Sequence, residues 1–375
     1  MYRVIELGHI VAGPTAGLIL SEMGFEVIKI ERPGSGDISR QLTGQSEGSF
    51  PYYNRNKKSL ILNLKTGEGK RILRELIKSS DIVIDNYSAD FLKNLNLEYE
   101  ELRKINSRLI YVTIRGYGKG KNENRKSLDY PIEIDSGIAY MNGLKGKPMR
   151  VGASLVDMFA AMTAVIGIYD ALLEREKTRQ GKIIDASLFP SAMFMIGQHI
   201  STYQIRNREM EPINEAGFAW GIYDFFRTED GKDIFIAVTT DEQWKSFASS
   251  FKIGDDLINK YSTNEVRFRE REKLIPYLSE ILIKYGSKEI SEILDRNNLV
   301  YSFLRKPWDL LNDPDCVEMM NRVTFKGKEM MLPSIPVSKK RKETVPELGE
   351  NNRDVLLSLG YTDDEIGDLR NRGII

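Results

Sequence analysis

Apolar runs of strand length alternate with helix-like segments through the first half of the chain. Strands are predicted at residues 2–7, 26–31, 59–64, 81–85 and 108–114. Helices are predicted between them at residues 15–23 and 66–78, with two short helices after residue 87. Strands that alternate with helices at this spacing are typical of a parallel, mostly doubly wound α/β sheet. We therefore predict an α/β fold for this half.

The later part of the chain has a different pattern. Residues 222–227 and 233–238 alternate as a hairpin around the turn at residues 229–232. Helical periodicity follows at residues 241–251, 265–285 and 287–296. A polar stretch at residues 206–215 precedes the hairpin, and we interpret it as a linker. These elements predict a smaller α+β domain.

The most apolar stretch, residues 158–173, has the length and alanine content of a helix. Because its apolar residues face every direction, we expect this helix to be buried inside a domain. Asp157 stands at its N-terminal end. Ser154 and Asp157 have the spacing of an N-cap and N3 pair, which makes Asp157 a capping residue. Alternatively, a carboxylate that the helix N-terminus keeps ionised, and that is partly removed from water, is suited to nucleophilic attack.

At 375 residues the chain is long enough for two domains. Its 54 basic and 54 acidic residues balance, so no overall field favours nucleic acid or a membrane surface. We expect no membrane span, because the apolar runs are short or interrupted, and no signal peptide. The single Cys316 excludes an internal disulfide and predicts a cytoplasmic protein. With only His9 and His199 as histidines, no metal site is predicted.

The first predicted strand is followed by the glycine-rich turn GHIVAGPTAG. Its glycines do not have the G-x-G-x-x-G spacing, so the sequence does not favour NAD as the ligand. The turn still brings backbone amides close to any ligand above the sheet. Ligands of such sheets bind at the carboxyl ends of the strands. Residues expected there are Arg32, Asn86, Tyr87 and Arg115.

Basic residues gather near the same strand ends, at Arg32, Arg55, Lys57, Lys58 and Lys65. As a pocket, they suit a nucleotide that carries several phosphates. As a surface, they are an ordinary run of solvated charge. Both interpretations stay open at this point.

Six motifs in order make the chain resemble the family III CoA-transferases, the group that includes formyl-CoA transferase, carnitine CoA-transferase and the α-methylacyl-CoA racemases. They are GHIVAGP with EVIKIERPGSGD, NRNKKSLILNLKTGEG, DIVIDNY, RLIYVTIRGYG, VGASLVDM with LLEREKTRQGKIIDASL, and LGENNRDVLLSLG. The match is strong in the first domain and looser around residues 211–322.

The resemblance implies a Rossmann-like large domain that is split by an insertion. It places the large, CoA-binding domain at residues 1–200 and 330–375, the small domain at 212–320, and linkers at 201–211 and 321–329. It also implies a homodimer whose two chains are interlocked, with each site facing the partner's small domain.

The resemblance further implies that Asp157 is the nucleophile and that no cofactor is tightly bound, since coenzyme A or acyl-CoA is a substrate. The residues that it places along the CoA are Ile10, Val11, Ala12, Arg32, Leu62, Lys65, Asn86, Tyr87 and Lys126. The glycine-rich lid of formyl-CoA transferase is absent, because NEAGFAWGIYDFF occupies its place. Formyl or oxalyl specificity is therefore not expected.

The predicted function is an acyl-CoA:carboxylate CoA-transferase that acts through an aspartyl mixed anhydride and an aspartyl-CoA thioester. One alternative is an α-methylacyl-CoA racemase, which needs a second proton-transferring group. Leu128 stands where the racemases have a histidine, although Asp129 or Glu133 could replace it. The other alternative is a CoA-binding protein without catalysis. Small-molecule acyl-CoA and carboxylic acids are the predicted partners, with no nucleic acid and no membrane.

Overall fold

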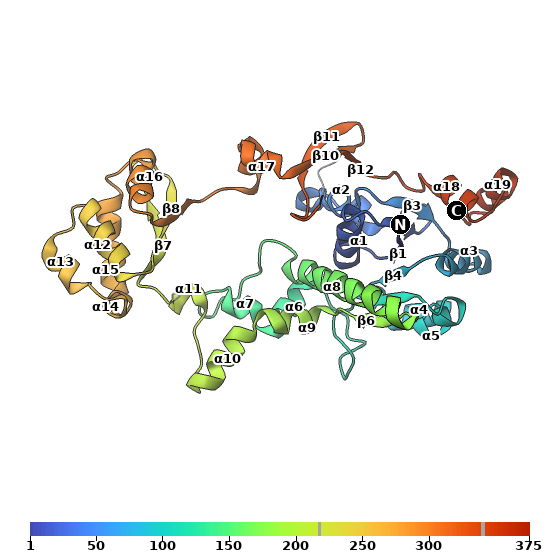
Figure 1. The fold of residues 1–375 in the computed structure, drawn as a ribbon, viewed down its shortest axis with the longest axis horizontal. Helices are drawn as coiled ribbons and strands as arrows, with labels where there is room; N and C mark the ends of the chain where they lie inside the picture. The colour runs from blue at the N-terminus through green and yellow to red at the C-terminus, as the bar shows by residue number, and fades with distance from the viewer. Residues whose placement is uncertain (217–218, 339–341) are drawn as a thin grey trace. The chain divides into compact units, whose positions relative to one another are not determined.

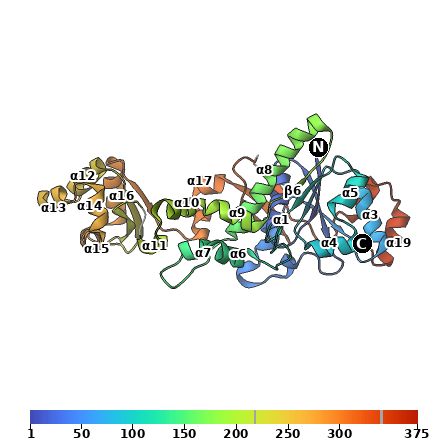
Figure 2. The same cartoon turned by 90° about the horizontal axis from the view of Figure 1, so that it is seen from below.

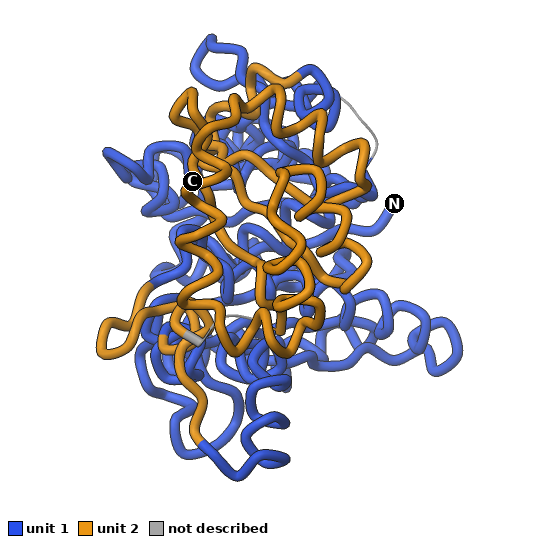
Figure 3. The backbone as a smooth tube through the Cα atoms, turned by 90° about the vertical axis from the view of Figure 1, so that its left-hand side faces the viewer, with its two compact units in different colours: residues 1–139, 150–208, 314–375 blue, residues 140–149, 209–313 orange. Residues whose placement is uncertain are grey.

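The computed structural model describes residues 1–216, 219–338 and 342–375, and the chain forms two compact units. Unit 1 consists of residues 1–139, 150–208 and 314–375, and unit 2 of residues 140–149 and 209–313 (Figure 3). The chain thus leaves unit 1 twice and returns to it twice. Two residues of the segment that replaces the glycine-rich lid, Gly217 and Phe218, lie outside the described residues.

Unit 1 is built on a six-stranded parallel sheet with the strand order β3-β2-β1-β4-β5-β6. The strands are β1 (Arg3–Leu7), β2 (Glu26–Glu31), β3 (Lys58–Ile61), β4 (Ile82–Asp85), β5 (Ile110–Thr113) and β6 (Ile183–Asp185). This confirms the predicted parallel α/β sheet, to which the structure adds β6. The chain order reverses between β1 and β4, and in open α/β sheets such a reversal opens a crevice for ligands.

Helices cover both faces of this sheet (Figures 1 and 2). On one face α1 (Ala12–Glu22) packs against β1, β2 and β4 and against α8 (Leu155–Thr178). On the other face a hydrophobic cluster joins alternate strand residues such as Ile5, Ile28 and Val83 to five helices. These are α3 (Gly67–Lys78), α4 (Ala89–Leu95), α5 (Tyr99–Ile105), α18 (Asn352–Ser358) and α19 (Asp363–Asn371). Since α19 follows α18 directly, the C-terminus completes this layer.

The structure corrects one expectation about α8. One face of this helix, with Ala160, Ala164 and Ile168, is buried, but Met162, Ile166 and Leu173 are 49%, 70% and 71% exposed. It is therefore not buried on all sides. By length and composition it is also the one helix in the described part of the chain that could cross a membrane. The core helix of a soluble protein passes the same test, and the buried alanine face against α1 fits that description.

A second sheet in unit 1 was not predicted. It consists of β10 (Met320–Phe325), β11 (Lys328–Pro333) and β12 (Lys342–Thr344), in the order β11-β10-β12. Val323 and Val345 pack there on Phe50 of α2 (Ser49–Asn54). Residues 321–329, interpreted from the sequence as a linker, are thus β10, its turn and the start of β11.

The remaining elements of unit 1 are short. They are α6 (Asp129–Ser136), α9 (Leu188–Met195), α10 (Gly197–Arg206), α17 (Pro314–Glu318) and the 3-10 turns at Ile38–Gln41 and Gly44–Ser46. Helices α9 and α10 are separated at Ile196, where the backbone leaves the helical conformation.

Unit 2 is a small α+β unit. Its hairpin, β7 (Ile222–Arg227) and β8 (Asp233–Val238), has the predicted bounds, and β9 (Val300–Phe303) pairs with β8. Its other elements are α11 (Ile213–Ala216), α12 (Asp241–Ser250), α13 (Asp255–Lys260), α14 (Asn264–Arg269), α15 (Arg271–Leu282), α16 (Ser287–Arg296) and a 3-10 turn at Pro307–Asn312, while α7 (Ile138–Met141) lies where the chain first leaves unit 1. The core centres on Trp244 and Phe247, which are fully buried.

Candidate active site

A cavity of about 620 Å³ opens at the carboxyl ends of β1, β4 and β5, where the strand order reverses. The turn after β1, the loop after β4 and the N-terminal end of α8 all contribute to it. Its lining residues that bear on the chemistry are His9, Ile10, Val11, Ala12, Asn86, Tyr87, Arg115, Arg125, Lys126, Leu128, Asp129 and Asp157.

The structure brings most of the predicted site residues together in this cavity. Asp157 lines it, as do Ile10, Val11, Ala12, Asn86, Tyr87 and Lys126. Arg32 is exposed beside it, close enough for its charge to act on His9 and Tyr87. Lys65 is exposed on the surface away from the lining. Leu62 is 1% exposed in the core beneath the sheet, so its side chain does not reach a ligand.

The turn after β1 is held in an unusual conformation. Ile10 has a φ of 66°, which is rare for a β-branched residue and costs conformational energy. The neighbouring backbone is fixed by Asn86, whose amide accepts from the His9 N–H (3.0 Å) and donates to the His9 carbonyl (2.9 Å). The helix α1 begins directly afterwards, without a side-chain cap at Val11 and without an acidic residue in its first turn. Its N-terminal amides are therefore available to an anionic group in the cavity.

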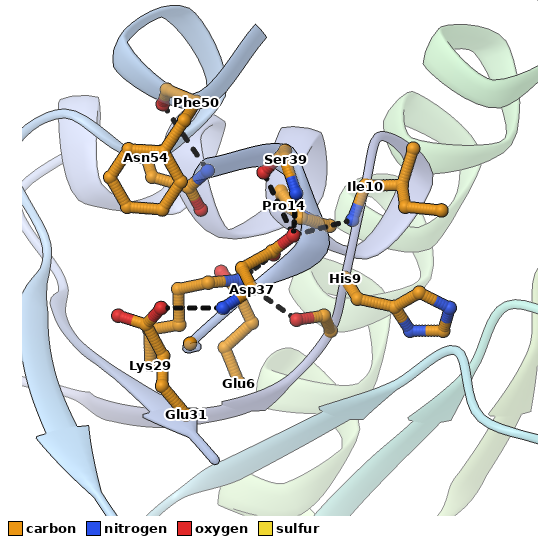
Figure 4. A network of polar contacts seen from close by, with 12 residues as sticks. Glu6, His9, Ile10, Pro14, Lys29, Glu31, Asp37, Ser39, Phe50 and Asn54 are labelled. Atoms are coloured by element: carbon orange, nitrogen blue, oxygen red, sulfur yellow. Dashed lines mark hydrogen bonds and ion pairs between the residues drawn. The ribbon is translucent and has the colours of Figure 1, made fainter. Parts of the chain in front are cut away.

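Beneath this turn lies a buried network of two lysines and two carboxylates. Lys29 Nζ contacts Glu6 at 2.9 Å and Asp37 at 2.7 Å, and Lys57 Nζ contacts the other oxygen of Glu6 at 2.7 Å. Asp37 in turn accepts from the Ile10 N–H at 3.3 Å, as Figure 4 shows. Burial alone would raise the pKa of Asp37, but Lys29 holds that pKa well below its usual range. The network thus anchors the strained turn with a fixed negative charge.

The network corrects the interpretation of the basic cluster as a phosphate pocket. Lys57 is fully buried on Glu6, and burial lowers the pKa of its amine to about 8. Arg55 is also buried, between Glu22 and Glu343. Lys58 pairs with Glu26. These three cations are used inside the protein, so only Arg32 and Lys65 of the five stay open to a ligand.

The N-terminal end of α8 is also capped differently from the prediction. Ser154 occupies the N-cap position, but its side chain makes no capping hydrogen bond. Instead Asp129 of α6 accepts from the N–H groups of Val156 (3.0 Å) and Asp157 (3.1 Å). Asp157 is therefore not the capping carboxylate.

The environment of Asp157 raises the pKa of its carboxyl to about 7. Burial is the main cause and the charge of Asp129 adds to it, while Arg150 acts in the opposite direction. The expectation that the helix N-terminus keeps this group ionised is therefore wrong, because Asp129 occupies the terminal amides. At neutral pH the group is divided between an acid and a carboxylate, which is a perturbation typical of reactive residues.

Two further residues in or beside the cavity were not assigned a role from the sequence. His9 lines the cavity with its ring stacked on Tyr87, at 5.0 Å between centroids, and burial lowers the pKa of its imidazole. Tyr53 of α2 lies close enough for the charges of Asp157 and Asp129 to act on it. Burial is the main cause that raises the pKa of its phenol to about 12, and these charges add to it. No pattern in the sequence links Tyr53 to Asp157. Within the described ranges no group of three or more His, Cys, Asp or Glu side chains is arranged to hold a metal ion.

Comparison with known proteins agrees with this geometry. The model of the family described as CoA-transferase family III matches residues 2–352. The succinate–glutarate CoA-transferase of Agrobacterium fabrum is 29% identical over 95% of this chain and 94% of its own length. The succinyl-CoA:glutarate CoA-transferase of Mus musculus is 30% identical over 100% of this chain and 89% of its own length. A CaiB/BaiF family protein from Brucella suis has the same fold, with a TM-score of 0.84 and 26% identity over 96% of this chain and 98% of its own.

The family match spans the turn at Ile10, the loop at Asn86 and the helix that begins beside Asp157. It confirms the resemblance seen in the motifs. This protein is therefore an enzyme of CoA-transferase family III.

Proposed function

We propose that this enzyme moves coenzyme A from an acyl-CoA thioester to a free carboxylic acid, with the Asp157 carboxylate as nucleophile. The observation that carries the proposal is the shared cavity of Asp157 and the uncapped N-terminus of α1. A carboxylate and amide donors in one partly buried space are what attack on a thioester carbonyl requires.

The reaction runs through two covalent states. Ionised Asp157 attacks the thioester carbonyl, the C–S bond breaks, and a mixed anhydride and the CoA thiolate form. The thiolate then attacks the aspartyl carbonyl of the anhydride, which releases the donor acid as a carboxylate and leaves an aspartyl-CoA thioester. An acceptor carboxylate repeats the two steps in reverse order. Amides at Val11 and Ala12 would stabilise the oxyanions.

For the CoA itself we propose the basic side of the cavity, where Lys126 lies with Arg32 beside it. Arg115 and Arg125 also line this side, although they pair with Glu123 and Asp135 at 3.7 Å and 2.7 Å. Phosphates favour such cations. For the acids we propose dicarboxylates, because the similar enzymes are named for succinyl-CoA, glutarate and mesaconate. A second carboxylate could also use this basic side.

We further propose a homodimer with interlocked chains, located in the cytoplasm. The exposed apolar residues of α8 are continued on α9 and α10 by Phe194 and Ile205, which are 79% and 82% exposed. Apolar surface of this kind is typical of an interface. Interlocked chains cannot part while folded, so sedimentation over a wide dilution range should show a dimer throughout. A folded monomer at low concentration would contradict the interlocking.

The test of the chemistry is to trap the covalent states. Wild-type enzyme with succinyl-CoA and no acceptor should gain the mass of one CoA less one water, and peptide mapping should place it on Asp157. Borohydride added during turnover should reduce the same residue. A CoA adduct on another residue, with transfer intact in Asp157→Asn, would refute Asp157 as the nucleophile.

A racemase is the second candidate, because His9 lies in the same cavity as Asp157 and burial favours its neutral, proton-accepting form. Leu128, at the position of the racemase histidine, lines the cavity and cannot accept a proton. We expect a chiral 2-methylacyl-CoA to keep its configuration and its α-proton in deuterated water. Fast exchange that depends on Asp157 and His9, without CoA transfer, would favour the racemase.

A further inference from the structure

The N-terminal end of α8 brings together carboxyl groups from two helices. Asp129, only 5% exposed, accepts from the N–H groups of Val156 and Asp157 through one oxygen, and its other oxygen lies 3.4 Å from Arg150. Glu133, one turn further along α6, is fully buried and accepts from the Val151 N–H at 3.0 Å. Burial and the neighbouring Asp129 raise the pKa of Glu133 to about 6. Acidic groups therefore outnumber cations around the nucleophile.

The charged and titratable groups that act on Asp157 come from three elements. Asp129 belongs to α6, Arg150 to the segment that leads into α8, and Tyr53 to α2. Arg150 is half exposed, so solvent screens its charge, whereas Asp129 is buried. The phenol of Tyr53 is neutral at physiological pH. Of the neighbouring side chains, Asp129 therefore has the largest effect on the Asp157 pKa.

The position of Asp129 has a second effect. The N-terminal amides of a helix ordinarily stabilise a carboxylate in its first turn. Here the amides of Val156 and Asp157 donate to Asp129 instead, so Asp157 receives a negative neighbour in place of two donors. Both effects make the ionised form of Asp157 less stable.

We propose that Asp129 is a positioning residue that shifts the first half-reaction toward the aspartyl-CoA thioester, by making the free carboxylate of Asp157 energetically unfavourable. This inference rests on the proposed function. The half-reaction converts one enzyme carboxylate and one acyl-CoA into one enzyme thioester and one free carboxylate. The negative charge therefore leaves the crowded end of α8 and departs on the donor acid.

The size of the effect follows from a thermodynamic cycle. At a pH above its pKa, Asp157 reacts as a carboxylate. An interaction that destabilises this carboxylate shifts the equilibrium toward the neutral aspartyl-CoA thioester by the same free energy. Each pKa unit of destabilisation corresponds to about a tenfold change in the equilibrium constant. The pKa of about 7 for Asp157 supports a contribution of this size from its surroundings.

The test compares Asp129→Asn with the wild type. Asparagine keeps an oxygen that can accept from both amides, so the cap is retained while the charge is lost. Enzyme is equilibrated with succinyl-CoA and succinate at fixed ratios, at about pH 8.5 to keep Asp157 ionised in both proteins. The fraction that carries CoA is read from the intact protein mass. We expect the equilibrium constant for the thioester to fall about tenfold in Asp129→Asn, and the Asp157 pKa, read by ¹³C NMR of labelled aspartate, to fall by about one unit.

Two matched variants complete the experiment. Asp170→Asn removes the same charge from an exposed position on α8 and should change neither value. Arg150→Gln removes the opposing cation and should raise the pKa and favour the thioester, which gives an independent test if Asp129→Asn does not fold. If wild type forms no CoA adduct, the proposed function is wrong. If wild type forms the adduct but Asp129→Asn has an unchanged equilibrium constant, only the role of Asp129 is wrong. Where Asp129→Asn does not fold, an unchanged equilibrium constant in Arg150→Gln leads to the same conclusion.

Discussion

Unit 1 contains two clusters of buried charge that adjoin the same cavity and respond to burial in opposite ways. In the cluster beneath the turn, Asp37 lies against Lys29, and its pKa is held well below the usual range although burial alone would raise it. At the end of α8, Asp157 lies near Asp129, and its pKa rises to about 7. The two carboxyl groups differ in the sign of their neighbours more than in their burial.

The difference separates a structural cluster from a reactive one. Lys29 and Lys57 lie against Glu6 and Asp37, so the first cluster has as many basic as acidic groups, and it anchors the strained Ile10 turn. The second cluster has an excess of carboxyl groups, and in the proposed mechanism one of them, Asp157, loses its charge in a covalent bond. A balanced cluster stabilises the fold, whereas an unbalanced one stores free energy that a reaction can use.

The largest effect should come from the unbalanced cluster. Asp157→Asn keeps the shape of the side chain but removes the nucleophile, so we expect transfer to fall at least about 10⁴-fold. Binding of CoA should change little, because the basic side of the cavity is untouched. Steady-state transfer between two acids measures the first quantity, and titration calorimetry with CoA the second. Activity within tenfold of wild type would be incompatible with the assignment.

Changes to the balanced cluster should lower the free energy of unfolding. Lys29→Met leaves Glu6 and Asp37 buried with one cation fewer, which we expect to cost about 3 to 5 kcal/mol of the free energy of unfolding. The control is Lys58→Met, because Lys58 is partly exposed in its pair with Glu26 and should cost at most about 1 kcal/mol. Urea unfolding of unit 1 measures both. Equal losses in the two variants would remove the distinction between the clusters.

A smaller loss is expected from crowding the same cluster. A Cβ atom on Gly17 would lie 1.9 Å from the Glu6 carboxylate, so Gly17→Ala must displace the partner of Lys57. We expect a loss of about 1 to 3 kcal/mol in unfolding free energy. Gly48→Ala is the control, since nothing lies within 4 Å of its added Cβ. A neutral Gly17→Ala would mean that the cluster can adjust freely.

The smallest effect concerns pH. In the proposed mechanism only ionised Asp157 attacks, so we expect its raised pKa to make kcat/KM fall about tenfold per pH unit as the pH drops below about 7, and level off above it. Asp37 should add no step between pH 5 and 8, because its pKa lies far below that range. A pH profile of kcat/KM that stays flat down to pH 5 would place the Asp157 pKa near its ordinary value.

The sequence by itself determined the local elements and the family. Strand β2 and the hairpin of β7 and β8 have the predicted bounds, because alternation and turn residues encode them within a few positions. The helix predicted at residues 66–78 is α3, and the Thr66 side chain caps it by accepting from the Gly69 N–H. The motifs identified the family, and they drew attention to Asp157, whose role as nucleophile stays a prediction.

Only the tertiary structure decided which charges meet. Arg55 was a phosphate candidate until Glu343, 288 positions away in the chain, was seen to pair with it. The cap of α8 comes from Asp129 and not from the adjacent Ser154, and burial together with the charge of Asp129 raises the pKa of Asp157 instead of lowering it. The periodicity of apolar residues in the sequence shows only on which face of its own helix or strand each residue lies. Burial, partners and the resulting pKa depend on distant segments, so they are fixed only when the chain folds.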